Sequence, residues 1–285
     1  MRAVNNDREP ISASQEVPAR IPGLQLSSRR VRGHRQSWGF AGFHDVVPLS
    51  GRRWALAVGG VYGQAIGDCD PAAAQIDIAR VVTRAIAQVD FTPSVVLAGM
   101  NRALLAGGSA QEQRALAAAY VTVRPSLVGT WARICVAGPQ TAFLRRSSGR
   151  MVVIGRPGTA LGLRADPELS DARLLLRAGD ILTLVTASVT ESLGGPDRIC
   201  EILADAGRAS AARSTGDIAR AIMDIADGPN TRDGVVLAVK VPGTGRDHGL
   251  HSAGWLGRGR YPADGWPGQR SARDRAPSGR TRYPF

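Results

Sequence analysis

The sequence predicts an α/β fold of the α+β kind, in which antiparallel sheets carry helices on their outer faces. Two observations predict it. Strand-like segments come in runs separated by two pairs of helical segments, without the regular strand–helix–strand alternation of a parallel sheet. The chain also has 285 residues, of which 44% are hydrophobic, and this is enough to form a sizeable buried core.

The first expected strands are short runs rich in aliphatic and aromatic residues, at 24–31, 40–47 and 53–59. A long helix follows, because Asp70 suits the N-cap, Pro71 suits the first helical position, and apolar residues then recur at helical spacing. A second helix is expected to open at Thr92-Pro93. The remaining expected strands are 117–123, 131–137, 141–146, 151–155, 173–177, 181–187 and 235–241, and the remaining expected helices lie near 196–206 and 214–227.

Charge is distributed unevenly along the chain. The net charge is +12, yet residues 1–37 hold seven Arg against three acidic residues, and residues 241–285 hold eight against three. We therefore expect a flexible segment at 1–17, one domain at 18–242, and a disordered tail at 243–285 that is rich in Arg, Gly and Pro. Arginine and aromatic residues are interleaved in that tail, so binding of nucleic acid or another polyanion is one alternative function.

Several protein classes are excluded by what the sequence lacks. No stretch approaches 18 consecutive apolar residues, and the first residues do not resemble a secretory signal, so we expect no membrane span and a cytoplasmic protein. The three cysteines show no C-x-x-C spacing, which argues against a disulfide framework or a cysteine zinc site. There is no P-loop, G-x-G-x-x-G or G-x-S-x-G motif, and the four histidines offer little for a metal site or a catalytic triad.

Six short segments, taken in order, carry a family resemblance. They are Gly42–Val46, Trp54–Gly63, Val136–Pro139, Ala160–Leu163, Gly179–Thr186 and Arg232–Val235. They resemble, respectively, the G-G-D-F-Y-D-V, W-x-L-x-I-G-D-V-x-G, N-A-G-H-P, P-L-G-L, G-D-x-L-L-L-Y-T and D-D-V-T motifs of the metal-dependent protein phosphatase (PPM, protein phosphatase 2C-like) family. The resemblance is to the bacterial branch typified by stage II sporulation protein E, and it runs from about Pro18 to Pro242. It implies a sandwich of two packed antiparallel sheets flanked by helices.

The resemblance also implies a chemistry that this chain departs from. Members of the family hydrolyse phosphoserine or phosphothreonine with two Mg²⁺ or Mn²⁺ ions, which are held chiefly by Asp carboxylates and activate a water molecule. Three of the expected Asp positions are occupied by Gly42, Gly60 and Ala187, and only Asp233 corresponds to a family ligand. One carboxylate cannot hold two divalent ions close together against their repulsion. We therefore expect a degenerate metal site with no catalytic residues and no metal cofactor.

Other carboxylates are alternative ligands. Asp68 and Asp70 follow the second motif, and Asp45 lies on the strand of the first. These residues could rebuild a Mn²⁺ or Mg²⁺ site, which would make the chain an active serine/threonine phosphatase with rearranged ligands. Against this, Asp70 suits a helix cap and Asp68 a solvated loop, and strand alternation alone leaves open which face Asp45 occupies.

The function expected from the resemblance is therefore that of a pseudophosphatase, a regulatory protein that acts by binding another protein. Relatives in the family act on phosphorylated anti-anti-sigma proteins in partner-switching pathways, so such a protein, or its kinase, is the expected partner. This expectation rests on analogy with the family, since fold alone does not determine function.

Overall fold

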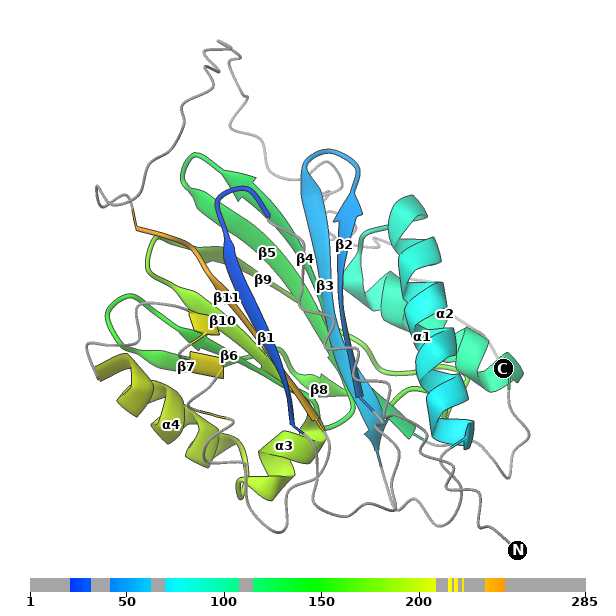
Figure 1. Cartoon of the computed structure of the whole chain (residues 1–285). Helices are drawn as coiled ribbons and strands as arrows, with labels where there is room; N and C mark the ends of the chain where they lie inside the picture. The colour runs from blue at the N-terminus through cyan, green and yellow to red at the C-terminus, as the bar shows by residue number, and fades with distance from the viewer. Residues whose placement is uncertain are drawn as a thin grey trace, which may run out of the picture. The chain divides into compact units, whose positions relative to one another are not determined.

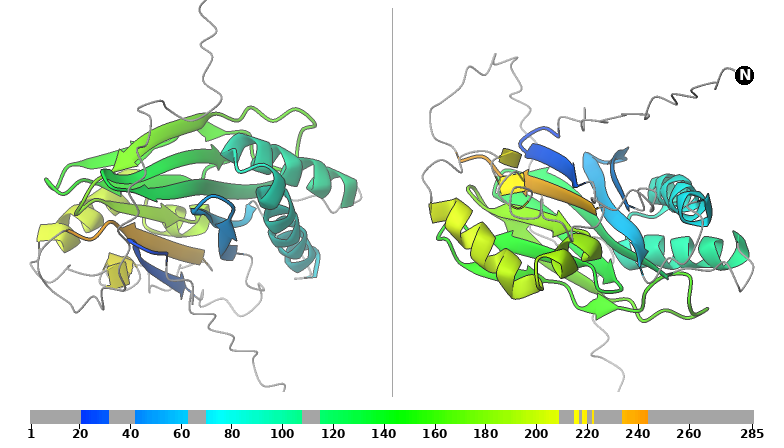
Figure 2. Two further views of the ribbon diagram at one scale, coloured as in Figure 1. Left: turned by 90° about the horizontal axis from the view of Figure 1, so that it is seen from above. Right: turned by 60° about the horizontal axis from the view of Figure 1, so that its bottom comes forward.

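The computed structural model describes residues 21–31, 42–62, 70–107, 115–208 and 234–243, together with five positions between 215 and 222. These residues belong to one compact unit, Met1–Thr244. Two helical layers enclose two packed sheets in it, in the order helices, sheet, sheet, helices (Figures 1 and 2). The segment 1–17 and, beyond Gly243, the expected tail 243–285 lie outside the described residues.

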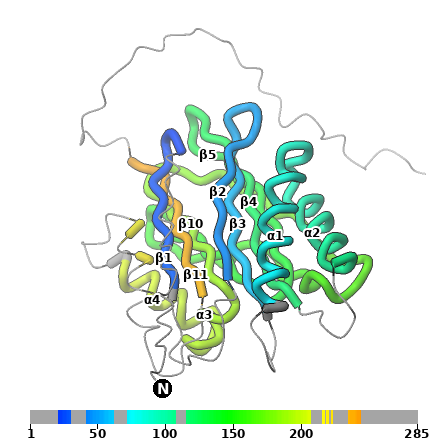
Figure 3. The backbone as a smooth tube through the Cα atoms, turned by 45° about the vertical axis from the view of Figure 1, so that its right-hand side comes forward, coloured from blue at the N-terminus to red at the C-terminus, as the bar shows by residue number. Residues whose placement is uncertain are grey.

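One sheet, called sheet A here, takes its strands from both ends and the middle of the described chain. In spatial order they are β1 (Gln25–Val31), β11 (Gly234–Lys240), β10 (Ile181–Val185), β6 (Thr141–Arg145) and β7 (Met151–Ile154). Every neighbouring pair is antiparallel, as the sequence predicted. Figure 3 shows β10, β11 and β1 running side by side.

The other sheet, called sheet B, is a meander with a short addition at its edge. Its strands are β2 (Gly42–Leu49), β3 (Arg53–Tyr62), β4 (Ala115–Ser126) and β5 (Gly129–Ala137), with β9 (Asp171–Leu176) and β8 (Pro157–Gly158) both on the outer side of β5. All pairs are antiparallel except β5 with β8, which is parallel. The prediction of purely antiparallel sheets was therefore right except for this two-residue strand.

Helices cover the outer face of each sheet. They are α1 (Asp70–Val89), α2 (Pro93–Gly107), α3 (Ala187–Ser192) and α4 (Pro196–Arg208). None of the helices in the described part is long and apolar enough to cross a membrane. Most of the helix expected near 214–227 lies outside the described residues, although Ile218, Ala219 and Ile222 are buried against sheet A.

Three apolar layers follow from the alternation of side chains along the strands. The central layer lies between the sheets and contains Leu56 and Val58 from β3 together with Leu237 and Val239 from β11. A second layer joins sheet B to α1 and α2, and a third joins sheet A to α3 and α4. Inner strands such as β4 and β11 therefore send alternate residues into the central layer and into one of the two outer layers.

Candidate functional site

Two of the three family Asp positions meet where β2 begins and β3 ends. Gly42 and Gly60 are register partners in this antiparallel pair. Leu56 and Val58 point into the layer between the sheets, and Gly60 follows them in the alternation. A side chain at position 42 or 60 would therefore project toward sheet A. Glycine supplies no oxygen ligand at either position.

The third position, Ala187, begins the short helix α3, which the sequence did not predict. This helix lies at the same end of the sandwich as the end of β3 and the beginning of β11 (Figure 1), and it contacts both strands. The backbone N–H of Ala187 donates to Gln140 Oε1 at 3.2 Å, while Gln140 Nε2 donates to the carbonyl of Val185 at 2.6 Å. Gln140 is buried, so its amide holds the start of the helix in place.

Residues on either side of Ala187 bind the first residues of β11. Thr186 and Val235 exchange backbone and side-chain hydrogen bonds: the N–H of Thr186 donates to the Val235 carbonyl at 3.0 Å, and the N–H of Val235 donates to Thr186 Oγ1 at 3.0 Å. The hydroxyls of Thr186 and Ser188 are 3.1 Å apart. These neutral groups are engaged with one another and with the backbone, so they bring no charge to this end of the sandwich.

Gly234 allows the close packing of α3 on β11. A Cβ atom there would lie 2.3 Å from Val189 Cγ2, 2.6 Å from Thr186 Oγ1 and 2.9 Å from Ser188 Oγ. All three distances are shorter than ordinary contacts between non-bonded atoms. The first turn of α3 therefore fills the space directly above the backbone at position 234.

Asp45 lies on the opposite face of β2 from Gly42. Its neighbours in the alternation, Phe43 and Val47, pack in the layer beneath the helices. Both carboxylate oxygens accept hydrogen bonds from Arg84 of α1, with Nε to Oδ2 at 2.6 Å and Nη2 to Oδ1 at 2.9 Å. This carboxylate thus faces α1 and is neutralised there.

His44, next to Asp45 on β2, points toward sheet A. Its Nε2 is 3.2 Å from Ser28 Oγ on β1, so the contact joins the edge strands of the two sheets. Burial, followed by the charge of Arg30, lowers its pKa from 6.5 to about 4. The imidazole is therefore neutral near pH 7.

The remaining ligand candidates lie outside the described part of the chain. Asp68 and Asp233 lie outside the described residues, and so does the side chain of Asp70, although α1 begins at that residue. No group of three or more His, Cys, Asp or Glu residues within the described part could hold a metal ion. The residues described at Gly42, Gly60 and Ala187 do not fit a pair of hard divalent cations, which require oxygen ligands.

The acidic residue of the G-D-x-L-L-L segment, Asp180, has a structural role. Its side chain is almost fully buried and accepts hydrogen bonds from Arg146 Nη1 at 2.7 Å, from the N–H of Ser147 at 2.9 Å and from the N–H of Arg177 at 2.8 Å. Gly179 before it has a φ of 85°, in the left-handed region that favours glycine. This motif therefore builds the turn that leads into β10.

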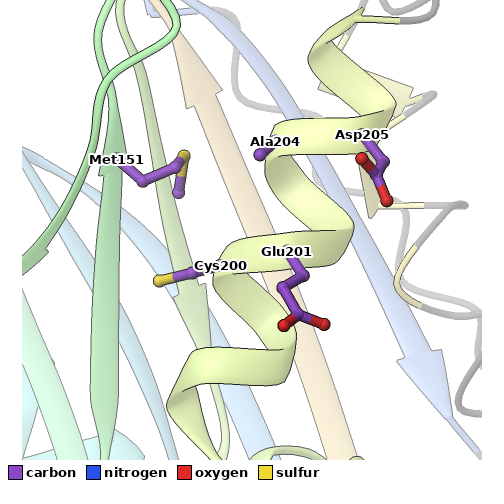
Figure 4. A pocket seen from close by; sticks show the side chains of 5 residues that line it. All are labelled: Met151, Cys200, Glu201, Ala204 and Asp205. Atoms are coloured by element: carbon purple, nitrogen blue, oxygen red, sulfur yellow. The ribbon is translucent and has the colours of Figure 1, made fainter.

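An open groove of about 510 Å³ lies between α4 and β7, on the outer side of sheet A (Figure 4). Its lining consists of Met151, Cys200, Glu201, Ala204 and Asp205. Glu201 pairs with Arg198 at 2.7 Å, and burial, followed by the charge of Asp197, raises the pKa of the Cys200 thiol. A raised pKa leaves less of the reactive thiolate at neutral pH.

A comparison with protein families decides the family of the chain. The profile of the stage II sporulation protein E (SpoIIE) family matches residues 50–242. The chain belongs to this family. The resemblance carried by the six sequence segments is thereby confirmed, and the domain is a protein phosphatase 2C-like phosphatase domain of the SpoIIE type. No protein with a curated description matches the sequence.

Solved structures share the fold. The RsbU and RsbW domains of a Mycobacterium tuberculosis protein match with a TM-score of 0.64 and 18% identity, over 78% of this chain and 62% of that one. The phosphatase domain of SpoIIE from Bacillus subtilis, with a fragment of its regulatory domain, matches with a TM-score of 0.58 and 12% identity, over 77% of this chain and 64% of that one. A serine/threonine phosphatase of S. agalactiae matches with a TM-score of 0.61 and 14% identity, over 76% and 99%. The chain thus spans less than two thirds of the length of the first two.

Sequence reasoning missed the residues that order this end of the sandwich. Gln140 follows the Gly138-Pro139 turn without any pattern that marks it as a hydrogen-bonding partner of α3. The run from Ile181 to Ala187 reads as one continuous strand, yet β10 ends at Val185 and the helix begins two residues later. The strand ends where Thr186 bonds to Val235 of β11 and Ala187 bonds to Gln140. Both partners are distant in sequence, so no local pattern marks the change from strand to helix.

Proposed function

We propose that this SpoIIE-family chain is a pseudophosphatase that has lost the metal centre and acts by binding a protein of a partner-switching pathway. One observation carries the first half of this proposal. Gly42 and Gly60 are paired in register and bear no side-chain oxygen on the face toward sheet A, where the resemblance expects two carboxylates. Ala187 adds no ligand either.

The state of Asp45 supports the same proposal. A metal site with rearranged ligands would need a new carboxylate on the face of Gly42 and Gly60. Asp45 instead faces α1 and is held by two hydrogen bonds from Arg84. Moving it to the other face would require a one-residue change of register, which would also turn Phe43 and Val47 out of their apolar layer.

Calorimetric titration of the full chain with Mn²⁺, together with hydrolysis of p-nitrophenyl phosphate, tests the loss of the metal centre. We expect no heat of specific Mn²⁺ binding and no Mn²⁺-dependent turnover. Asp233→Ala should change neither the titration heat nor the hydrolysis rate. The S. agalactiae phosphatase serves as the active control. Mn²⁺-stimulated hydrolysis that Asp233→Ala abolishes would establish an active phosphatase with rearranged ligands and refute the proposal.

Restoring the carboxylates gives a second, positive test. Gly42 and Gly60 lie within strands, where Asp can adopt the backbone conformation. We expect the variant Gly42→Asp/Gly60→Asp/Ala187→Asp to bind Mn²⁺ that the parent chain does not bind. A parent chain that binds Mn²⁺ as tightly as this variant contradicts the proposal.

Partner binding supplies the second half of the function. The matched structures include RsbU and RsbW domains and a protein of the bacterial stressosome, and this supports a protein partner for the present chain. Titration with an anti-anti-sigma-type protein, in its phosphorylated and unphosphorylated forms, and with its kinase tests this. We expect micromolar or tighter binding to one of the three. Absence of binding to all of them would remove the partner-switching role and leave the metal result standing.

A further inference from the structure

The end of sheet B farthest from Gly42 and Gly60 carries an exposed apolar patch. It is formed by the β4–β5 hairpin, whose last register pair is Ser126 with Gly129, and by the neighbouring strand β9. The hairpin reaches the end of the sheet opposite to α3 (Figure 1). Here the term hairpin patch means Arg124, Leu127, Val128, Trp131, Arg173 and Leu175.

The loop of this hairpin is unusually apolar. Short hairpin loops are commonly built from Asn, Asp and Gly, but this one is Leu127-Val128. Leu127 is 101% exposed and Val128 69% exposed, and Trp131, two residues past Gly129, is 42% exposed. Contiguous exposed apolar residues beside an aromatic side chain are typical of protein interaction sites.

The patch lies just beyond the part of sheet B that the helices cover. Trp131, Arg133 and Cys135 alternate onto the same face, and Cys135 is buried in the layer beneath α1 and α2. Arg133 then marks the border, because it donates to Asp171 at 2.8 Å while Asp171 binds the N–H of Ser94 at the start of α2. Past this border no helix of the described part covers Trp131, which accounts for its exposure.

The charge of the patch is positive. In register, Trp131 is flanked by Arg124 of β4 on one side and by Leu175 of β9 on the other, and Arg173 lies on the same face. Neither Arg124 nor Arg173 forms an ion pair among the described residues. Burial, followed by the charge of Arg124, lowers the pKa of nearby Arg53, so positive charges are crowded here. Asp171 offers little compensation because Arg133 already neutralises it.

We propose that the hairpin patch is a docking surface for an acidic segment of a partner protein that also carries exposed aliphatic side chains. The aliphatic side chains pack on Trp131, Leu127 and Leu175, and the carboxylates pair with Arg124 and Arg173. Tryptophan and arginine are the residue types that contribute most to protein interfaces. Complementary charge around an apolar centre gives such an interface its specificity.

A nucleic acid is the less suitable occupant of this surface. Arginine and tryptophan would suit phosphates and bases, but Leu127, Val128 and Leu175 would remain against a polyanion that offers no aliphatic side chains. The proposal is independent of the metal centre, because the patch lies at the other end of the sandwich. It therefore applies whether or not the chain hydrolyses phosphate esters.

Binding of defined probes to the full chain tests the proposal. The probe is a fluorescein-labelled peptide in which Asp and Glu alternate with pairs of Leu, measured by fluorescence anisotropy. Peptides of equal charge without Leu and a single-stranded oligonucleotide of equal charge are the comparison ligands. Two patch variants, Arg124→Glu/Arg173→Glu and Leu127→Ser/Val128→Asn, separate the contributions of charge and apolar contact. All of their side chains are exposed or partly exposed, and an unchanged urea midpoint checks that each variant folds.

Matched controls lie elsewhere on the same protein. Arg102→Glu changes the charge of an exposed side chain of α2, and Val81→Ser removes an exposed apolar side chain of α1. We expect each patch variant to raise the Kd of the Leu-containing peptide by about tenfold or more, and the controls by less than about twofold. Photo-crosslinks from the peptide are expected within 124–131 and 171–176.

Three results would overturn the proposal. The first is an unchanged Kd of the Leu-containing peptide in both patch variants. The second is a rise of that Kd in the two control variants equal to the rise in the patch variants. The third is tighter binding of the oligonucleotide than of the peptide, abolished by the same patch variants, which would assign the surface to nucleic acid. The Arg-rich segment 241–285 is present in every variant, so binding of anions to it contributes a constant background.

Discussion

Replacement of Gly234 by alanine tests whether α3 is seated on β11 as described. The new Cβ would lie 2.3 Å from Val189 Cγ2 and 2.6 Å from Thr186 Oγ1, while carbon atoms in contact normally stay about 3.5–4.0 Å apart. Both neighbours are buried, so the helix must shift by about 1 Å or the strand must bend. Overpacking of this kind costs about 1–3 kcal/mol.

A second effect acts in the opposite direction. Alanine reduces the conformational freedom of the unfolded chain and so stabilises the fold by about 0.4–1 kcal/mol. The expected net loss in the free energy of unfolding is therefore about 1–2 kcal/mol. For a domain of this size the loss corresponds to a decrease in Tm of about 2–8 °C. Urea unfolding followed by circular dichroism measures it directly.

A double-mutant cycle identifies the cause of the loss. Val189→Ala removes the methyl group that the new Cβ meets, so Gly234→Ala should be less costly in that background than in the parent chain. Hydrogen exchange should also quicken at the amide of Val189, which bonds to the Thr186 carbonyl at 3.1 Å. An unchanged or raised free energy of unfolding for Gly234→Ala would refute the close packing of α3 on β11.

Three further predictions follow from buried polar groups. Asp180→Ala removes the charged partner of Arg146 and the acceptor of two backbone N–H groups, so we expect the free energy of unfolding, measured in urea, to fall by about 3 kcal/mol; a fall below about 1 kcal/mol would contradict that network. Asp45→Asn should cost only about 0.5–1 kcal/mol because Arg84 is 55% exposed, and should leave Mn²⁺ titrations unchanged; altered Mn²⁺ binding would identify Asp45 as a ligand. The pKa of His44 is lowered from 6.5 to about 4, so the unfolded chain takes up a proton in this interval that the folded chain does not, and stability falls as the pH falls through it. Between pH 7 and pH 4 the free energy of unfolding should fall by about 2–3 kcal/mol less in His44→Gln than in the parent chain. Equal falls in the two proteins would exclude His44 as a cause of acid destabilisation.

Local patterns in the sequence predicted most of the elements. Apolar residues at helical spacing after Asp70 predicted a long helix, and α1 (Asp70–Val89) confirms it, but Val81 and Val89 of that apolar series are exposed, so the buried face of the helix is a different one. Runs of β-branched residues predicted strands equally clearly, as at β11. The two-residue strand β8 carries no such signal, since its pairing with β5 is made by tertiary structure alone.

The candidate site was less predictable, because faces and partners depend on register. The sequence could not decide which face Asp45 occupies until its pairing with Ala57 of β3 and its contact with Arg84 were known. Asp171 likewise gives no local sign that it caps α2 across 77 positions of sequence. The order of the motifs predicted the family, because that order is kept even where individual residues are substituted. Side-chain contacts, in contrast, are known only from the folded chain.

The path of the chain through the two sheets has a consequence for folding. Between β1 and β11 the chain passes from one sheet to the other after β1, β5, β7 and β9. Sheet A is not encoded by a continuous stretch, so it cannot assemble before segments from both ends of the domain have met, whereas β2 to β5 of sheet B follow one another along the chain. Chains with such non-local pairing fold slowly. We therefore expect a single cooperative transition, and a fragment ending after β5, at Ala137, should not fold because it supplies only one strand of sheet A.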